Sequence, residues 1–405
     1  METIYSKARI DTLGYIVTGK TPKTSCVDNF GGSYPFITIP DLGQSRDVIE
    51  TERTLSERGA RSIRRSAIPQ GSILMSCIAT VGKCGITTQQ SFTNQQINSL
   101  VPNHRLSPIY GYYAFCMLKE ALEVSGSGGA TYTNVSKSRF GALKIPLPPL
   151  KVQRQIASIL GALDDKIENN RKTAATLEEM ARALHRSWFV DFDPVHAKAA
   201  GQKPAFMDEE TAALFPDRFG DDGLPEGWEL EPLSEFLELV YGKSLRRADR
   251  VPGSYPVYGS GGTDSTHNVA LIEEPTVIIG RKGTVGSIQW APSGCWPIDT
   301  TYYIRSAWPI SYIYRVLQSL PLSEMNTDAA VPGLNRSNVY RLEVPLANNE
   351  VVQCFADISA VIQEKIDNCY SESRILADIR DTLLPKLMSG EIRVGEVREQ
   401  VEEVT

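Results

Sequence analysis

The segment GYIVTGKT, from Gly14 to Thr21, is the part of the sequence that most directly suggests chemistry. It fits the phosphate-loop pattern GxxxxGK[ST], in which a strand leads through a glycine-rich loop into a helix whose backbone N–H groups surround phosphate. The next residues include Pro22, a Gly-Gly pair and Pro35, which leave no room for a long helix. A second copy of the segment has Leu237 where the first glycine should stand. We therefore expect no nucleotide hydrolysis at Lys20.

Other signs of catalysis are weak. The histidines have no spacing suited to metal ligation, and we find neither a dinucleotide-binding fingerprint nor a nucleophile elbow. The carboxylate pair Asp164-Asp165 is expected on a helix surface and the pair Asp191/Asp193 in a connector, where solvation or capping explains them. We expect no catalytic residue, no metal site and no cofactor in this chain. The four histidines are His104, His185, His196 and His267.

The sequence contains an internal repeat of two similar units. The string LKIPLP, from Leu143 to Pro148, corresponds to LEVPLA at an offset of 199, and no gap is needed from there to Trp188. The residue types that recur are Gly, Lys or Arg, Ser or Thr, and Asn, which are suited to contacts with phosphates and base edges. Further upstream the corresponding strings are GSYP at Gly32 and Gly253, Gly19-Lys20-Thr21 and Gly242-Lys243-Ser244, ILMSCIATVGKCGI from Ile73 and VIIGRKGTVGSIQW from Val277, and NQQIN from Asn94 and DTTYY from Asp299.

Each copy is predicted to be a mixed α/β body followed by a long helical arm. Short apolar runs such as SILMSCIA and TVIIG, bounded by Gly and Pro, fit strands. In the first arm, apolar residues keep an alternating spacing of three and four from Ile156 to Trp188, with Asn170 in the one polar position. In the second arm the same seam runs from Phe355 to Leu387 and includes Arg380. This spacing predicts two coiled-coil helices of about 55 Å that pair antiparallel. The alternative is two amphipathic helices in separate cores.

Composition limits the class of protein. The 405 residues carry a net charge of −6, with 41 % hydrophobic and 22 % charged residues, and exceed the length of a single core. No run of 18 apolar residues suggests a membrane span, and the N-terminal residues lack the core of a secretion signal. Seven cysteines without a CxxC pair favour reduced thiols in the cytoplasm. Residues 1–150 carry a charge of +6, which is compatible with phosphate contacts, whereas residues 227–349 carry −2.

The sequence resembles the DNA-specificity subunits of type I restriction–modification enzymes. The most specific strings are IPLPPLKVQRQIASILGALDDKIENN leading to SWFVDFDPV, LPEGWELEPLSEFLELVYGKS, and DTLLPKLMSGEIRV. The resemblance implies a non-catalytic subunit with two target-recognition domains, each of which reads half of a split DNA sequence. It also implies that the two arms set the spacer and bind two methyltransferase subunits and, through them, restriction subunits. The implied divisions are recognition domains at 1–149 and 227–349, arms at 150–199 and 350–390, a connector at 200–226 and a tail at 391–405.

Candidate DNA-binding residues follow from side-chain chemistry and from recurrence in loop-like stretches. Arg61, Arg64 and Arg65 form the densest basic cluster, which a solvated helical face explains equally well. Trp188 and Phe189, at the end of the first arm, are expected to pack in a core. The candidates in the first body are Lys20, Thr21, Thr80, Lys83, Asn94, Gln95, Gln96, Tyr132, Lys137 and Arg139. Those in the second are Lys243, Ser244, Arg246, Arg247, Arg281, Lys282, Thr284, Thr300, Asn335, Arg336 and Asn338.

Two other classes of function compete with DNA recognition. A structural adapter with duplicated α/β heads would show no salt-sensitive DNA binding in its assembled complex. A nucleotide-dependent enzyme would have an ATPase activity that Lys20→Ala abolishes.

Overall fold

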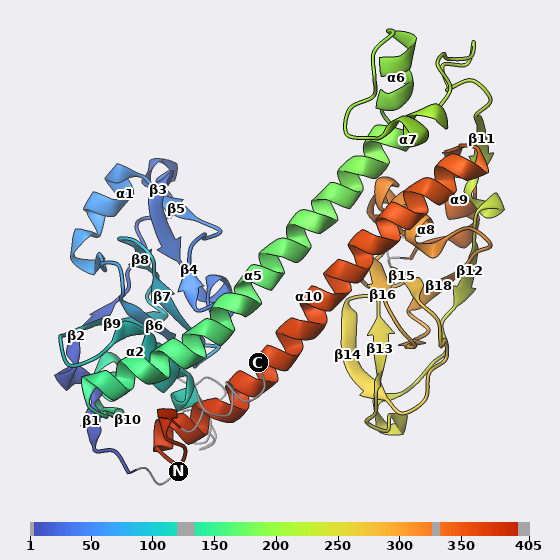
Figure 1. Cartoon of the computed structure of the whole chain (residues 1–405). Helices are drawn as coiled ribbons and strands as arrows, with labels where there is room; N and C mark the ends of the chain where they lie inside the picture. The colour runs from blue at the N-terminus through green and yellow to red at the C-terminus, as the bar shows by residue number, and fades with distance from the viewer. Residues whose placement is uncertain (1–3, 120–133, 326–332, 396–405) are drawn as a thin grey trace. The chain divides into compact units, whose positions relative to one another are not determined.

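The computed structural model describes residues 4–119, 134–325 and 333–395. The chain divides into two compact units, which we describe separately (Figure 1). Unit 1 comprises residues 1–170 and 372–405, and unit 2 comprises residues 171–371. In the described ranges, no helix combines the length and apolar character needed to cross a membrane.

Unit 1 contains a five-stranded main sheet, a smaller three-stranded sheet and a short strand pair. The five-stranded sheet has the order β2-β9-β6-β7-β4, the three-stranded sheet has the order β5-β3-β8, and β1 pairs with β10. Strand β6 is buried along its whole length, which accounts for its continuous apolar sequence. The strands are β1 (Lys7–Arg9), β2 (Gly14–Thr18), β3 (Phe30–Ile37), β4 (Asp47–Val48), β5 (Thr54–Leu55), β6 (Ile73–Ser76), β7 (Cys84–Thr87), β8 (Phe92–Thr93), β9 (Ile97–Pro102) and β10 (Lys144–Pro146). The shorter helices are α1 (Glu57–Ser62), α2 (Pro108–Cys116) and α4 (Lys137–Ala142).

Unit 2 repeats this topology without a counterpart of β4. Its main sheet has the order β12-β18-β15-β16, its smaller sheet has the order β14-β13-β17, and β11 pairs with β19. The strands are β11 (Glu229–Pro232), β12 (Glu238–Tyr241), β13 (Tyr255–Gly259), β14 (Gly262–His267), β15 (Thr276–Gly280), β16 (Ile288–Ala291), β17 (Trp296–Pro297), β18 (Thr301–Arg305) and β19 (Glu343–Leu346). The shorter helices are α6 (Asp193–Ala199), α7 (Glu209–Ala213), α8 (Ile310–Ser319) and α9 (Arg336–Tyr340).

The strands of the two copies correspond except for β4, which has no counterpart in the main sheet of unit 2. One part of the correspondence predicted from the sequence is wrong. The pairing of Phe36 with Phe92 in unit 1 matches the pairing of Val257 with Trp296 in unit 2. Asn94 therefore corresponds to Ile298, and not to Asp299 as the sequence comparison suggested. The offset of 204 that relates ILMSCIATVGKCGI to its copy continues through this loop. Polar loop residues carry no hydrophobic periodicity, so a shift by one residue left no trace in the sequence.

Two long helices contribute to both units, α5 (Leu150–Phe189) and α10 (Asn349–Ser389). In unit 1, Asn170 contacts Glu372 and Asp164 contacts Arg380, so the two helix segments run antiparallel. In unit 2, the C-terminal part of α5 packs against the N-terminal part of α10 around Phe355. The predicted antiparallel pairing is confirmed within each unit, and the predicted polar seam residue Asn170 is buried.

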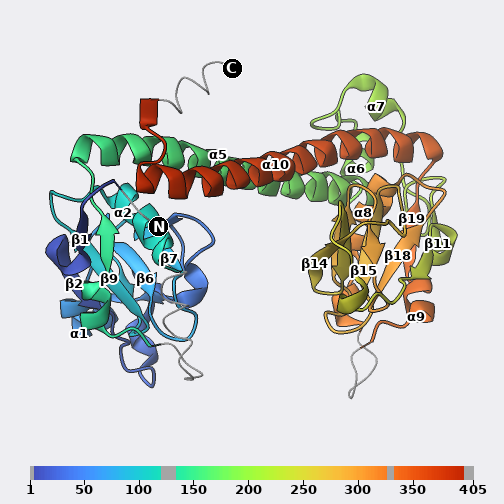
Figure 2. The same ribbon diagram turned by 90° about the horizontal axis from the view of Figure 1, so that it is seen from below.

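In each unit, one short helix lies between the main sheet and the long-helix pair (Figure 2). Helix α2 takes this place in unit 1 and helix α8 in unit 2, where Tyr113 and Tyr312 are almost fully buried. The prediction that Trp188 and Phe189 pack in a core is confirmed, since both are at most 3 % exposed and contact Phe355. Each body is thus attached to its helices by a continuous apolar core, which fixes its orientation on them.

The end of the described chain differs from expectation. The sequence GEIRV from Gly390 suggested a short strand, but residues 390–395 form no strand. Ile392 and Val394 instead pack into the apolar core of unit 1. Their alternate spacing resembles that of a strand, while their burial comes from packing against the core of this unit rather than from pairing in a sheet.

Candidate nucleic-acid interface

Most candidate residues of unit 1 come together at one end of the main sheet. We call this the loop end of unit 1; it comprises residues 19–21, 77–83, 94–96 and 134–139. The Lys20 amide donates to the Thr93 carbonyl at 2.9 Å, and the Cys77 amide donates to the Gln96 carbonyl at 2.7 Å. The carbonyl of Cys77 in turn accepts from Val135. Gly19 is required here, because a Cβ atom would lie 2.0 Å from the Asn94 carbonyl oxygen.

The polar side chains of this loop end form a small network. Thr21 donates to Gln95 at 2.7 Å, and the Asn94 amide group donates to Gln96 at 2.9 Å. Thr80 holds the following turn through its carbonyl, which accepts from Ser76, and Thr80 itself is exposed. The other exposed candidates are Lys20, Gln95, Lys137 and Arg139, while Thr21, Lys83, Asn94 and Gln96 are half-buried. Tyr132 lies outside the described residues.

Unit 2 builds its loop end with the same backbone hydrogen bonds. The loop end of unit 2 comprises residues 241–244, 281–284, 299–302 and 333–338. The Lys243 amide donates to the Pro297 carbonyl at 3.0 Å, and the Arg281 amide donates to the Thr300 carbonyl at 2.9 Å. A Cβ atom on Gly242 would lie 2.1 Å from the Ile298 carbonyl oxygen, as at Gly19. The Gly-Lys pair is therefore a conformational element of the repeat, not half of a phosphate loop.

The side chains at the loop end of unit 2 are more basic and more aromatic. Lys243 lies over the ring of Trp296, and Asn335 caps α9 by accepting from the Ser337 and Asn338 amides. Arg281 and Arg336 both lie over Tyr241. Lys243, Ser244, Lys282, Thr284, Asn335 and Arg336 are exposed, while Arg281, Thr300 and Asn338 are half-buried.

Two predicted residues do not join this group. Arg246 pairs with Asp249 at 2.7 Å, and Arg247 pairs with Asp264 on β14 at 3.4 Å. Both arginines are exposed, and a neighbouring carboxylate offsets each charge. The basic cluster at Arg61, Arg64 and Arg65 also lies on an exposed surface, which fits a solvated face and a DNA contact equally well.

The aromatic residues of this site were not predicted from the sequence. Tyr241 directly precedes Gly242-Lys243 and is 52 % exposed, and its ring lies 5.0 Å from that of Tyr302. An aromatic residue next to a recurring Gly-Lys pair was the available signal. Recurrence could not reveal it, because the first copy has Thr18 at the corresponding place.

A phosphate loop is excluded by the local fold. Gly14 and Thr18 lie within strand β2, which pairs with β9 along its whole length. After Thr21 the chain continues to a three-residue turn of helix at Val27–Asn29, so the Gly-Lys pair does not lead directly into a helix as a phosphate loop does. The expected absence of a phosphate loop is confirmed. Within the described ranges, no group of three or more His, Cys, Asp or Glu side chains is arranged to hold a metal ion.

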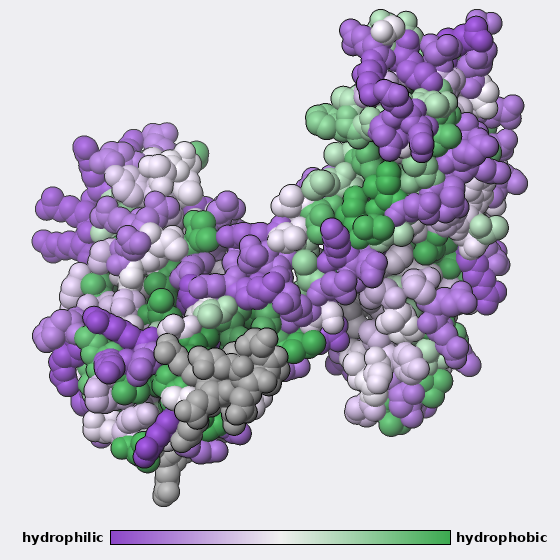
Figure 3. Space-filling model, viewed as in Figure 1, coloured by the Kyte–Doolittle hydropathy of each residue, from purple (hydrophilic) through white to green (hydrophobic). Residues whose placement is uncertain are grey.

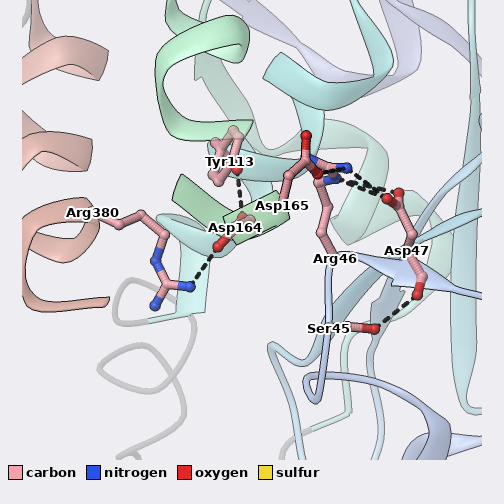
Figure 4. Close-up of polar contacts among 7 residues, drawn as sticks. All are labelled: Ser45, Arg46, Asp47, Tyr113, Asp164, Asp165 and Arg380. Atoms are coloured by element: carbon pink, nitrogen blue, oxygen red, sulfur yellow. Dashed lines mark hydrogen bonds and ion pairs between the residues drawn. The ribbon is translucent and has the colours of Figure 1, made fainter. Parts of the chain in front are cut away.

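A polar junction ties the body of unit 1 to both long helices, and Figure 4 shows its residues. The Tyr113 hydroxyl on α2 donates to Asp164 on α5 at 2.5 Å, and Arg380 on α10 donates to the other Asp164 oxygen at 2.7 Å. Burial and the Asp164 carboxylate raise the pKa of Tyr113, so this hydroxyl remains a hydrogen-bond donor. The Asp164 side chain is only 11 % exposed, so the expectation of solvation is wrong for Asp164, whereas the Asp165 side chain is 66 % exposed as expected.

Asp165 belongs to the same junction through Arg46. The Arg46 guanidinium, 10 % exposed, pairs with Asp165 at 2.8 Å and with Asp47 at 2.6 Å (Figure 4). Ser45 donates to the Asp47 carbonyl at 2.8 Å and supports the turn. The loop before β4 and helix α2 are thereby held against α5 by charge-assisted hydrogen bonds. This junction orients the body of unit 1, and with it the loop end, on the helix pair.

Unit 2 has a corresponding junction built from different residues. Arg315 on α8 is buried and pairs with Glu178 on α5 at 2.7 Å, while its other terminal nitrogen donates to Gln363 on α10 at 2.8 Å. Gln318 donates to Glu178 at 2.7 Å. Burial opposes ionisation of Glu178 and the Arg315 charge favours it, and the net effect is a lowered pKa. Gln363 corresponds to Asp164, so the two junctions occupy equivalent places with different charges.

His185, which lies next to the junction of unit 2, makes the stability of the folded chain depend on pH. The ring is 4 % exposed among Phe189, Tyr312 and Phe355, and burial, assisted by the Arg315 charge, lowers its pKa to about 3. The unfolded chain binds this proton below about pH 6.5 and the folded chain does not, so stability is present above that pH and is lost as pH falls. We expect the free energy of unfolding to fall by about 2 kcal/mol between pH 7 and pH 5 through His185 alone.

Urea unfolding of the wild type and of His185→Phe at both pH values measures this contribution. The variant is expected to lose about 2 kcal/mol less than the wild type over this pH interval. Equal pH dependence of the two proteins would show that His185 is accessible to protons in the folded state.

Comparisons with known proteins agree with the geometry. Residues 5–179 match the family model described as type I restriction modification DNA specificity domain. The MjaIX specificity subunit of a type I restriction enzyme from Methanocaldococcus jannaschii is 27 % identical over 96 % of this chain and 94 % of its own length. The HindI specificity subunit from Haemophilus influenzae is 36 % identical over 40 % of this chain and 37 % of its own length.

The fold is also known from a solved structure. The S subunit of a type I restriction–modification system from M. genitalium superposes with a TM-score of 0.58 and 20 % identity, covering 95 % of this chain and 96 % of that one. Residues 5–179 thus match the DNA specificity domain of type I restriction enzymes, and the chain as a whole is similar to a type I specificity subunit over nearly its full length.

Proposed function

We propose that this chain reads a bipartite DNA sequence, with residues 1–149 reading one half-site and residues 227–349 reading the other. The observation that carries the proposal is the duplicated loop end. In both units, the same backbone hydrogen bonds gather Gly-Lys, Asn, Thr and basic side chains at one end of a sheet. These are the side chains that bind phosphate oxygens and the edges of bases in the major groove.

The chain itself recognises DNA and leaves catalysis to its partners. Exposed lysines and arginines at the loop ends would bind phosphates, while Gln95, Asn94 and Asn338 would read base edges. A methyltransferase must extrude its target base from the helix, which requires the duplex to be held firmly next to that base. Two loop ends on rigidly oriented bodies would hold the duplex on both sides of the spacer.

The long helices are proposed to bind two methyltransferase subunits and, through them, the restriction subunits. Apolar side chains gather on the visible face of the helices in unit 2 (Figure 3). Met180, Ile358 and Val361 of these segments are 55, 37 and 55 % exposed. Large apolar side chains on an exposed helix face are typical of a protein interface. Ile375 and Ile379 give the α10 segment of unit 1 a similar character.

The proposal is tested by DNA binding of the chain assembled with its cognate methyltransferase. We expect sequence-specific binding whose logarithmic affinity falls linearly with the logarithm of salt concentration. A duplex with a scrambled sequence is expected to bind at least about 1000-fold more weakly. Binding that is insensitive to both salt and sequence would instead support a structural adapter, which the comparisons do not favour.

A further inference from the structure

Two arginines at the loop end of unit 2 converge on one tyrosine ring. The Arg281 guanidinium carbon lies 5.2 Å from the centre of the Tyr241 ring, and that of Arg336 lies 5.5 Å from it. Arg281 also lies 5.9 Å from the ring of Tyr302, and Arg336 lies 5.8 Å from that of Tyr340. Three aromatic side chains thus surround two cations at the edge of the main sheet.

The charges of the two arginines have no acidic partner in the described part of the chain. Among the described residues, no carboxylate forms an ion pair with Arg281 or Arg336, in contrast to Arg246, Arg247 and Arg250 nearby. Their hydrogen bonds go to backbone carbonyls. Arg281 donates through Nε and Nη2 to Asp299 at 3.2 and 2.6 Å, and Arg336 donates to Leu239 at 3.4 Å.

These contacts fix the orientation of the two guanidinium groups before any ligand arrives. The rings hold them in place without cancelling their charge, because a cation over an aromatic face keeps its formal charge and its outer N–H groups. Both cations lie within 5.5 Å of the same ring centre, and an anion that contacts both guanidinium groups is attracted by both charges. The planar N–H groups of arginine match phosphate oxygens in particular.

The first copy lacks this arrangement. Strand registers equate Tyr241 with Thr18 and Tyr302 with Asn98, and the equivalent of Arg281 is Cys77. In unit 1, the Thr18 hydroxyl donates to Asn98 at 2.7 Å, so two neutral side chains occupy the place of the two rings. Of the two arginines, only Arg336 has a basic counterpart, Lys137.

We propose that Arg281, Arg336 and Tyr241 form a clamp for a DNA backbone phosphate, through which the acidic second body binds the duplex by a device that the first body does not have. The inference rests on the proposed function and adds an asymmetry to it. The first body has an excess of basic residues, whereas residues 227–349 carry a net charge of −2. The second body therefore depends on a local pair of cations for its phosphate contact.

The test uses the complete chain in complex with its methyltransferase, with one duplex that carries the target and one scrambled duplex. We expect Arg281→Gln and Arg336→Gln each to weaken binding about tenfold, for both duplexes alike. The slope of log affinity against log salt is expected to decrease by about 1 for each variant and by about 2 for the double variant. Arg281→Lys keeps the charge and is expected to keep most of the slope.

Arg305→Gln is the matched control. Arg305 is an exposed arginine of the same body that lies 5.6 Å from the ring of Tyr303, at the opposite end of β18 from Arg281. Its removal is expected to leave the slope unchanged. Melting temperatures of all variants report any loss of fold, which would change affinity without changing the slope in steps of one charge.

The outcomes separate the two proposals. If the wild-type complex binds DNA and the double variant has an unchanged slope, the clamp is wrong and the proposed function stands. If the variants lose affinity for the target duplex alone, these arginines read bases and the phosphate assignment is wrong. If inorganic phosphate raises the melting temperature through these arginines while the slope is unchanged, the site binds anions other than DNA and the clamp is again wrong. No DNA binding by the wild type contradicts both proposals.

Discussion

Arg315→Ala is expected to destabilise unit 2 by about 3–5 kcal/mol. The Arg315 side chain is completely buried and pairs with Glu178, which is 22 % exposed. Removing the cation leaves a carboxylate in a poorly hydrated site and takes a hydrogen bond from Gln363. The free energy of unfolding, measured in urea by tryptophan fluorescence, gives the size of the loss. Trp188, Trp228, Trp290 and Trp308 all lie in or against the core of this unit.

Arg182 supplies the control for this prediction. It also pairs with Glu178, at 3.2 Å, but its side chain is 52 % exposed. Arg182→Ala is expected to cost less than about 1 kcal/mol, because solvent screens an exposed ion pair. Replacing both members of the buried pair, with Arg315→Met and Glu178→Leu, is expected to recover most of the stability. A loss for Arg315→Ala as small as that for Arg182→Ala would mean that water hydrates Glu178 in the folded protein.

The second large effect concerns the distance between the half-sites. Inserting seven residues into both α5 and α10, after Asn170 and after Ser371, is expected to lengthen the unread spacer. Both helices pass from one unit to the other at these places, and Asn170 contacts Glu372 there. Seven residues keep the phase of the seam and add about 10 Å, which is roughly three base pairs at about 3.4 Å each. Both half-sites are expected to stay the same.

The recognition sequence of the variant can be read from the DNA that it directs a methyltransferase to modify. An insertion in α5 alone is the control, and it is expected to abolish activity because the two helices then differ in length. A changed half-site with an unchanged spacer would show that the helices take part in reading bases and do not measure distance.

The features that follow from local periodicity were predictable from the sequence. The seam residues of α5 and α10 and the packing of Trp188 and Phe189 follow from helical spacing and apolar character. The Gly-Lys pair at Gly19 and Gly242 was recognisable as part of the repeat because it recurs without the first glycine of a phosphate loop. Its conformational reason is a neighbouring backbone carbonyl oxygen that leaves no room for a Cβ atom, and this contact exists only in the folded chain.

The features that depend on contacts between distant residues were not predictable. Asp164 meets Arg380 across 216 positions of sequence, so its role as a junction residue could not be read from its neighbours. Tyr241, Arg281 and Arg336 come from three separate segments and converge only in the folded sheet. Arg246 and Arg247 have the same residue type as Arg281, and only the fold shows that Asp249 and Asp264 neutralise them.

Two bodies of one chain are proposed to read two halves of a DNA target. Sequencing methylated bases in the DNA of cells that carry this chain with its cognate methyltransferase tests this proposal without any intermediate step. We predict methylation within a sequence of two specific halves separated by a gap of constant length and no sequence preference. An uninterrupted recognition sequence, or a methylation pattern that does not change when this chain is removed, would contradict it.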